Sequence, residues 1–158
     1  MLPNGSTMKR NTSKAFTVIE LLVVVTIIIV LTTIGVTSFT QAGVSSRNSK
    51  RKADMENVRQ ALVLYRSDMG AYPIALLPSA TGRYTVAIGT LVTADYLSAP
   101  VPTDPKNVAP YQYNYTSSVG PPPTFCLCAG LEGTNAGNST TTDCSSYATG
   151  NFYCVESP

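Results

Sequence analysis

The chain has 158 residues, which fits one domain plus one long segment, and it contains neither His nor Trp. Without histidine it lacks the commonest general base and the commonest zinc ligand. Its formal net charge of +2 gives no indication of a nucleic-acid partner, and none is expected. The charge is unevenly distributed, because the residues before 70 are basic and the residues after 70 are mildly acidic.

Residues 1–15 form a short polar, basic leader that ends at Ala15. We expect this leader to be removed from the mature protein. Met1 and Met8 remain alternative starts, because a compact basic leader also begins at Met8.

An apolar run begins at Phe16, and no charged residue lies between Leu21 and Ser46. As a helix, residues 21–46 would be ~39 Å long, which exceeds the ~30 Å hydrocarbon core of a bilayer. Residues 16–43 are therefore predicted to form a membrane-spanning helix. Glu20 is the only charge in residues 16–43. A lone charge at mid-bilayer costs about 2.5–3.5 kcal/mol, so we expect a specific role for this carboxylate.

The helix is predicted to continue to about residue 69, and Gly70 is suited to end it. Its later part carries apolar residues at steps of three and four, which is typical of a helix with one buried face. These residues are Met55, Val58, Leu62, Tyr65 and Met69. The stripe requires a partner surface, which the rest of the chain must supply.

Beyond residue 70 the composition changes to Pro, Gly, Thr, Ser and Tyr. Residues 84–88 are predicted to be a short strand or a loop, and residues 89–97 a short helix with Leu91, Val92, Tyr96 and Leu97 turned inward. An alternation of aromatic and polar residues predicts a strand at 111–116, and further strands are expected at 124–129 and 150–155, with a polar loop at 133–142. The expected fold class is α+β, with one long helix packed against an antiparallel sheet of three or four strands.

All four cysteines, Cys126, Cys128, Cys144 and Cys154, lie in the last third of the chain. This clustering predicts disulfides and an oxidising compartment. Cys126 and Cys128 are two apart in a predicted strand and poorly placed to bond to each other, so each should pair with Cys144 or Cys154. Two such arrangements are possible. The spacing lacks the C-x2-C pairs of common zinc sites, and no metal is predicted.

The sequence gives no indication of an enzyme or of a cofactor. P-loop, nucleophile-elbow and metalloprotease motifs are absent from it. Asp95 and Asp104 are the candidates for an acid–base pair, but nothing in the sequence places them together, and loop carboxylates are usually solvated.

The stretch Ala15-Phe16-Thr17-Val18-Ile19-Glu20-Leu21-Leu22 resembles the processing motif of type IV prepilins and type II secretion pseudopilins. The resemblance implies that a prepilin peptidase cuts between Ala15 and Phe16 and that Phe16 becomes N-methylated. It also implies that Glu20 attracts the free amine of Phe16 on a neighbouring subunit during assembly. Two departures are visible: Ala15 replaces the usual Gly, and the helix lacks the kinking Pro of many members.

Later stretches are similar to major pseudopilins as well. Residues 61–73 resemble their "AL..Y..D.G.YP" segment, and residues 95–113 resemble their "YL...P.DP....Y.Y" segment. The cysteine-containing tail does not resemble the calcium-binding end of those proteins. The resemblance therefore covers most of the chain up to about residue 116.

The resemblance implies a pilin-like organisation of leader 1–15, membrane and filament-core helix 16–43, and globular head 44–158. The expected function is a structural subunit of a type IV pilus or a type II secretion pseudopilus, and the choice between the two stays open. The expected partners are copies of the chain itself, the prepilin peptidase, the membrane and an inner-membrane assembly platform. Before assembly the chain should cross the bacterial inner membrane once, with a cytoplasmic N-terminus and an extracytoplasmic head.

Two alternatives remain at this stage. The chain could be a membrane-anchored, extracytoplasmic binding module that never polymerises, and such a module would not need Glu20.

The second basic cluster consists of Arg47, Lys50, Arg51 and Lys52. It is expected to be a solvated helix face, and the alternative is that it contacts lipid headgroups or acidic groups of other subunits.

Overall fold

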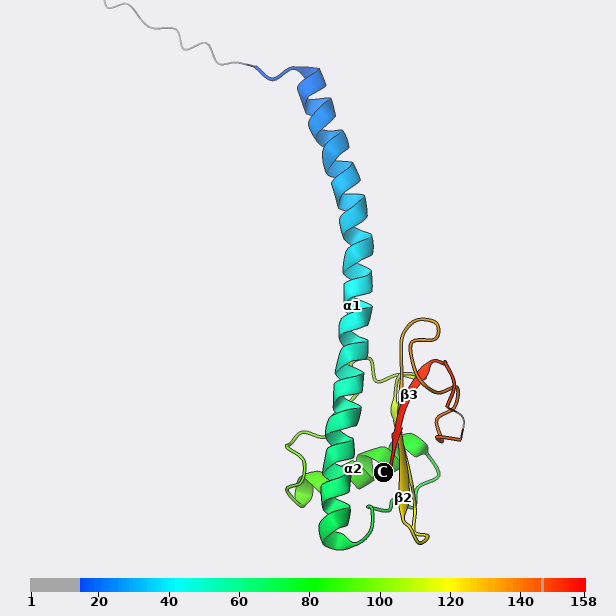
Figure 1. The fold of residues 1–158 in the computed structure, drawn as a ribbon. Coiled ribbons are helices and arrows are strands. Elements are labelled where there is room, and N and C mark those ends of the chain that lie inside the picture. The colour runs from blue at the N-terminus through cyan, green and yellow to red at the C-terminus, as the bar shows by residue number, and fades with distance from the viewer. Residues whose placement is uncertain (1–14, 146) are drawn as a thin grey trace, which may run out of the picture. The chain divides into compact units, whose positions relative to one another are not determined.

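The computed structural model describes residues 15–145 and 147–158, so residues 1–14 of the expected leader lie outside the described part. The elements follow the order α1 (Val18–Met69), α2 (Ala80–Thr93), β1 (Tyr113–Ser118), β2 (Thr124–Gly130) and β3 (Phe152–Glu156) (Figure 1). The strands form one antiparallel sheet in the order β1-β2-β3. The expected α+β class, with a long N-terminal helix and a small antiparallel sheet, is confirmed.

The chain divides into two compact units, one ending at Thr40 and the other comprising Gln41–Pro158. In the first unit, the large apolar side chains of α1 are exposed on every side of the helix. Exposed fractions are 83% for Val18, 58% for Val30 and 84% for Phe39. A helix that is apolar on all sides requires an apolar environment all round it.

In the second unit, one face of α1 packs into a hydrophobic core. Met55, Val58 and Leu62 are fully buried, as the apolar stripe predicts. The sheet supplies the facing residues, which include Tyr113, Tyr115, Phe125, Leu127 and Val155. Burying side chains of this size is the main source of the unit's stability, at roughly 1.5–3 kcal/mol for each large apolar residue.

The stripe ends earlier than its spacing predicts. Met69 is 58% exposed, because α1 ends there and Gly70 reverses the chain with a φ of +76°. The Gly70 N–H donates to the Arg66 carbonyl at 2.8 Å, which closes the helix as expected. Tyr72, from the segment after the turn, fills the core next to Phe125 instead.

Helix α2 corrects the expectation for residues 84–88, which are helical and not a strand or loop. The helix begins earlier because Ser79 caps it, accepting a hydrogen bond from the Gly82 N–H at 3.4 Å. Its buried residues are Tyr84, Ala87, Ile88 and Leu91, which share one helical face. Tertiary burial of that face therefore overrides the β-branched, alternating local pattern.

Side chains alternate across the sheet, so its two faces bury different residues. Leu127 pairs with Tyr115 and Val155, and all three belong to the core under α1. Cys126, Cys128 and Cys154 form a separate buried cluster on the opposite face. The segment after β2 lies beside β3, where Gly137 bridges Gly150 and Ser139 bridges Phe152 (Figure 1).

Candidate functional site

The N-terminal end of α1 holds the predicted processing and assembly residues. The Thr17 N–H donates to Glu20 Oε2 at 2.9 Å, and the Thr17 hydroxyl donates to the same oxygen at 2.8 Å. In return, the Glu20 N–H donates to Thr17 Oγ1 at 3.3 Å. This reciprocal pattern is a capping box, and it satisfies backbone donors that the first helical turn leaves without partners. The sequence T-x-x-E before an apolar run carries this signal, which our sequence interpretation missed.

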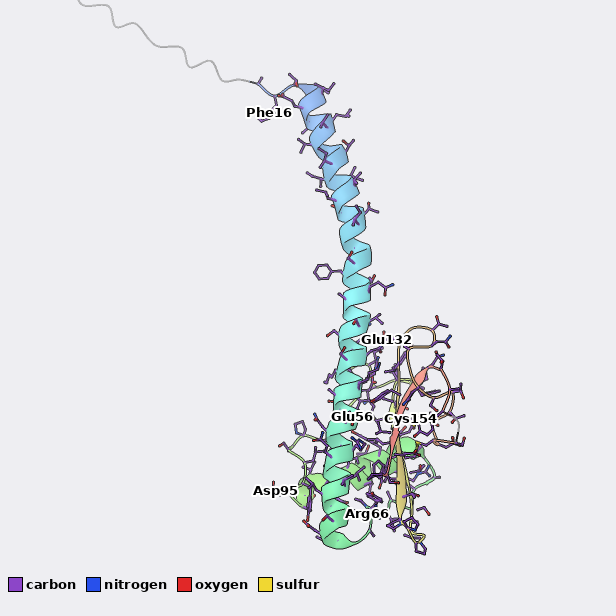
Figure 2. The ribbon with its side chains drawn as sticks, viewed as in Figure 1. Phe16, Glu56, Arg66, Asp95, Glu132 and Cys154 are labelled. Carbon is purple, nitrogen blue, oxygen red and sulfur yellow. A yellow bond between two sulfur atoms is a disulfide. The ribbon has the colours of Figure 1, made fainter. Side chains whose placement is uncertain are left out.

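Ala15 and Phe16 precede the capping box, and both are exposed. Phe16 is 86% exposed and stands at the N-terminal end of the helix (Figure 2). The capping hydrogen bonds involve Thr17 and Glu20 and do not use the Phe16 nitrogen. A carboxylate can accept about four hydrogen bonds, so capping leaves Glu20 with acceptor capacity for a further cation.

Helix α1 is long and apolar enough to span a membrane, by length and composition. The side chains in its most apolar window are exposed. Three threonine hydroxyls in this part, on Thr26, Thr32 and Thr33, donate to carbonyls one turn earlier, so their polar atoms are satisfied within the helix.

A buried charge cluster ties the head segment of α1 to two loops. Arg51 is fully buried, and its guanidinium donates from Nε to Asp104 Oδ2 at 2.6 Å and from Nη2 to Asp104 Oδ1 at 3.1 Å. Its third nitrogen, Nη1, donates to Glu132 Oε1 at 2.9 Å and to Asn48 Oδ1 at 2.8 Å. Bidentate Arg–carboxylate geometry is among the strongest charge-assisted arrangements in proteins.

Glu132 receives three cations. Arg47 donates to both of its oxygens at 2.7 Å, and Lys106 Nζ lies 2.8 Å from Oε2, in addition to Arg51. Hydrogen bonds from Arg47, and also from Lys106 and Arg51, hold the pKa of the Glu132 carboxyl well below its usual range although burial acts to raise it. The Asn48 side chain pairs with the backbone of Glu132: its Oδ1 accepts from the Glu132 N–H at 3.0 Å, and its Nδ2 donates to the Glu132 carbonyl at 2.8 Å.

This cluster overturns two expectations. Arg47 and Arg51 do not belong to a solvated helix face, because both pair with carboxylates of the head, whereas Lys50 and Lys52 are exposed as expected. Asp104 is only 5% exposed and is not a solvated loop carboxylate. Arg51, Asp104 and Glu132 are far apart in the chain, so no local pattern predicts their contact. Asp95 is exposed, and no hydrogen bond or ion pair joins it to Asp104 among the described residues.

All four cysteines are in disulfides, Cys126–Cys144 and Cys128–Cys154. This is one of the two arrangements that the sequence leaves open. The bridges connect β2 to the following loop and to β3, on the sheet face opposite α1. The disulfides hold the C-terminal segment after β2 against the sheet, and this segment has few apolar residues of its own.

The fold and these features define a class: a protein with one long N-terminal helix, apolar enough at its start to span a membrane, and a small, disulfide-bearing α+β head. Residues 38–147 match the family model described as type II secretion system (T2SS), protein G. The match covers more than half of the chain, and the chain therefore belongs to this family, the structural major pseudopilins of the type II secretion system. No curated protein and no solved structure gives a match.

Proposed function

We propose that this protein is a processed filament subunit, a pseudopilin that is cut between Ala15 and Phe16 and polymerises through α1. In this proposal residues 1–15 are the leader, residues 16–43 are the membrane and filament-core helix, and residues 44–158 are the head. The family match favours a secretion pseudopilus over a type IV pilus. A prepilin peptidase would make the cut and methylate the new amine of Phe16.

The observation that carries the proposal is the exposure of apolar side chains on all sides of α1 as far as Phe39. Before assembly a bilayer can cover this surface. In a filament, the same surface is covered by the helices of other copies. A single anchor would require the apolar surface and would use the Glu20 carboxylate only to cap its helix, whereas a filament also gives the carboxylate a partner on a neighbouring copy.

Glu20 supports the filament over a non-polymerising anchor. Residues 21–31 are almost uniformly aliphatic, so side-chain shape gives weak axial register between neighbouring helices. A pair formed by the Glu20 carboxylate and the Phe16 amine of a neighbouring copy would set the register, because a shift of one turn moves the partners ~5.4 Å apart. Misplacement would leave both charges unpaired in apolar surroundings, at a cost of several kcal/mol.

The proposed location follows from the same arrangement. The basic leader would stay on the cytoplasmic side of the inner membrane, where the peptidase and the assembly platform would act. The head would then lie outside the cytoplasm. Its two disulfides support that side, because such bonds persist in oxidising compartments.

The test compares two Glu20 variants with a matched control in the host secretion system. Glu20→Ala and Glu20→Gln should remain in the membrane fraction and should be cleaved normally, but they should form few or no filaments. The control Val24→Ala removes apolar surface from the same exposed helix without changing any charge, and it should still assemble. Wild-type filament numbers for Glu20→Ala in electron micrographs would contradict the register role.

A further inference from the structure

The sulfurs of three cysteines lie close together, and the sulfur of the fourth, Cys154, is bonded to one of them. Beyond the two disulfides, Cys126 Sγ lies 3.5 Å from Cys128 Sγ, and Cys128 Sγ lies 3.9 Å from Cys144 Sγ. The sulfurs of Cys126, Cys128 and Cys144 all lie within 4.8 Å of one another. Two disulfides that only stapled separate loops would not need to be in contact with each other.

Three of the four sulfurs are positioned by the sheet. Cys126 and Cys128 project from the same face of β2, and Cys154 of β3 is the direct cross-strand partner of Cys128. Their exposed fractions are 7%, 0% and 2%. The fourth, Cys144, comes from the loop after β2 and is half-buried. Ligands on paired strands stay in place better than ligands on loops, so most of this group should persist when the disulfides are opened.

Two of the distances between sulfurs of different bridges already suit a metal ion. Four thiolates around zinc at ~2.3 Å in a tetrahedron are ~3.8 Å apart. The separations of 3.5 and 3.9 Å between sulfurs of different bridges are close to that value. On reduction the sulfurs of each bridge would separate, and Cys154 would turn toward the other three sulfurs. The loop bearing Cys144 and rotation of the Cys154 side chain can supply these movements.

We propose that the reduced head binds one soft divalent cation of the zinc class through Cys126, Cys128, Cys144 and Cys154. The same four sulfurs would then hold the tail in two chemical states, as two disulfides or as one metal–tetrathiolate. Opening the bridges takes four electrons and gives four thiols. The reductant is a dithiol that becomes a disulfide, or a phosphine that takes oxygen from water to become a phosphine oxide. Metal binding then releases the four thiol protons.

A solvent-accessible hollow next to the cysteines would let an ion reach their sulfurs. A hollow of about 400 Å³ is lined by Cys126, Cys144, Asp143 and Glu156, among others. The two carboxylates give it a negative charge that attracts cations, and the half-buried Cys144 stands at its edge. Thiolate ligands select zinc-class ions over calcium and magnesium, which prefer oxygen.

The test uses the full chain in detergent micelles, reduced with a phosphine under anaerobic conditions and titrated with Co²⁺. The reduced protein should develop the sulfur-to-cobalt charge-transfer and visible bands of a tetrahedral thiolate site, saturate at one ion per chain, and lose the bands when Zn²⁺ is added. The oxidised protein is the matched control and should develop none of these bands, because no thiol remains in it. Cys144→Ser and Cys154→Ser should each weaken binding at least about tenfold.

Several results would contradict the proposed metal site. One is the absence of these bands in the reduced protein, and another is saturation at more than one ion per chain. Unchanged affinity in denaturant would show that the folded sheet does not preorganise the ligands. Loss of binding in Asp143→Asn together with full binding in Cys144→Ser would make the site a carboxylate site. All proposed ligands lie in the head, so none of these outcomes depends on filament assembly.

Discussion

Replacing Arg51 with Met tests whether the buried charge cluster holds the head together. Met fills much of the same space but leaves Asp104, whose side chain is fully buried, without its bidentate partner. Removing one member of a buried ion pair typically costs about 3–5 kcal/mol, because the other charge stays buried and uncompensated. For a head of this size, that loss should lower the melting temperature by on the order of 10–20 °C. Adding Asp104→Asn to Arg51→Met should recover part of the loss, because the uncompensated charge is then gone.

The matched control is Arg59→Met, on the same helix. Arg59 pairs with Glu56 at 2.8 Å, but both side chains are more than a third exposed, so its loss should cost about 0–1 kcal/mol. Thermal unfolding of the full chain in detergent, followed by near-ultraviolet circular dichroism of its tyrosines, measures both variants. Equal shifts in melting temperature for Arg51→Met and Arg59→Met would refute the reasoning that burial makes the Arg51–Asp104 pair far more important for stability than the exposed pair.

Three further predictions concern the head. Gly137→Ala should destabilise the head by at least about 1–3 kcal/mol, because the new Cβ would collide with the Phe152 backbone. Gly89→Ala in α2 is the control: its new Cβ meets open space, and it should stabilise the head by about 1 kcal/mol. Chemical unfolding measures the free energy of unfolding of both variants. Reducing the disulfides without metal should cost about 2–4 kcal/mol per bridge, given sequence separations of 18 and 26, and equal melting temperatures before and after reduction would contradict this. The pKa of Glu132 is lowered in the folded state from its ordinary value of 4.5, so its stabilisation is fully present above about pH 4.5 and is lost as pH falls towards the folded pKa. Glu132→Gln should flatten this acid dependence in melting curves, and an unchanged slope would contradict it.

Much of the architecture could be predicted because it rests on local patterns. The long helix follows from an uninterrupted apolar run and then a stripe with helical spacing, and the first strand follows from an alternation of aromatic and polar residues. Residues 84–88 misled the prediction, since Tyr84, Val86 and Ile88 also alternate. The helical face there is visible only when Ala87 and Leu91 are counted with Tyr84 and Ile88.

The site could be predicted only in part. Phe16 and Glu20 stand out in the sequence because the processing and register roles proposed for them rest on a short contiguous motif. The Arg51 cluster does not, because its carboxylates lie 53 and 81 residues further along the chain, and their contact depends on how the loops fold back on α1. Sequence reasoning favoured solvation for these charges, since isolated charges are rarely buried. Burial becomes possible here because several partners converge on the same carboxylates.

Mass spectrometry of filaments sheared from the host and purified away from membranes tests the central claim most directly. The account predicts that this chain is a subunit of the filaments and that its mass begins at N-methylated Phe16, with both disulfides intact. Recovery of the chain only in the membrane fraction, or with residues 9–15 still attached, would contradict it.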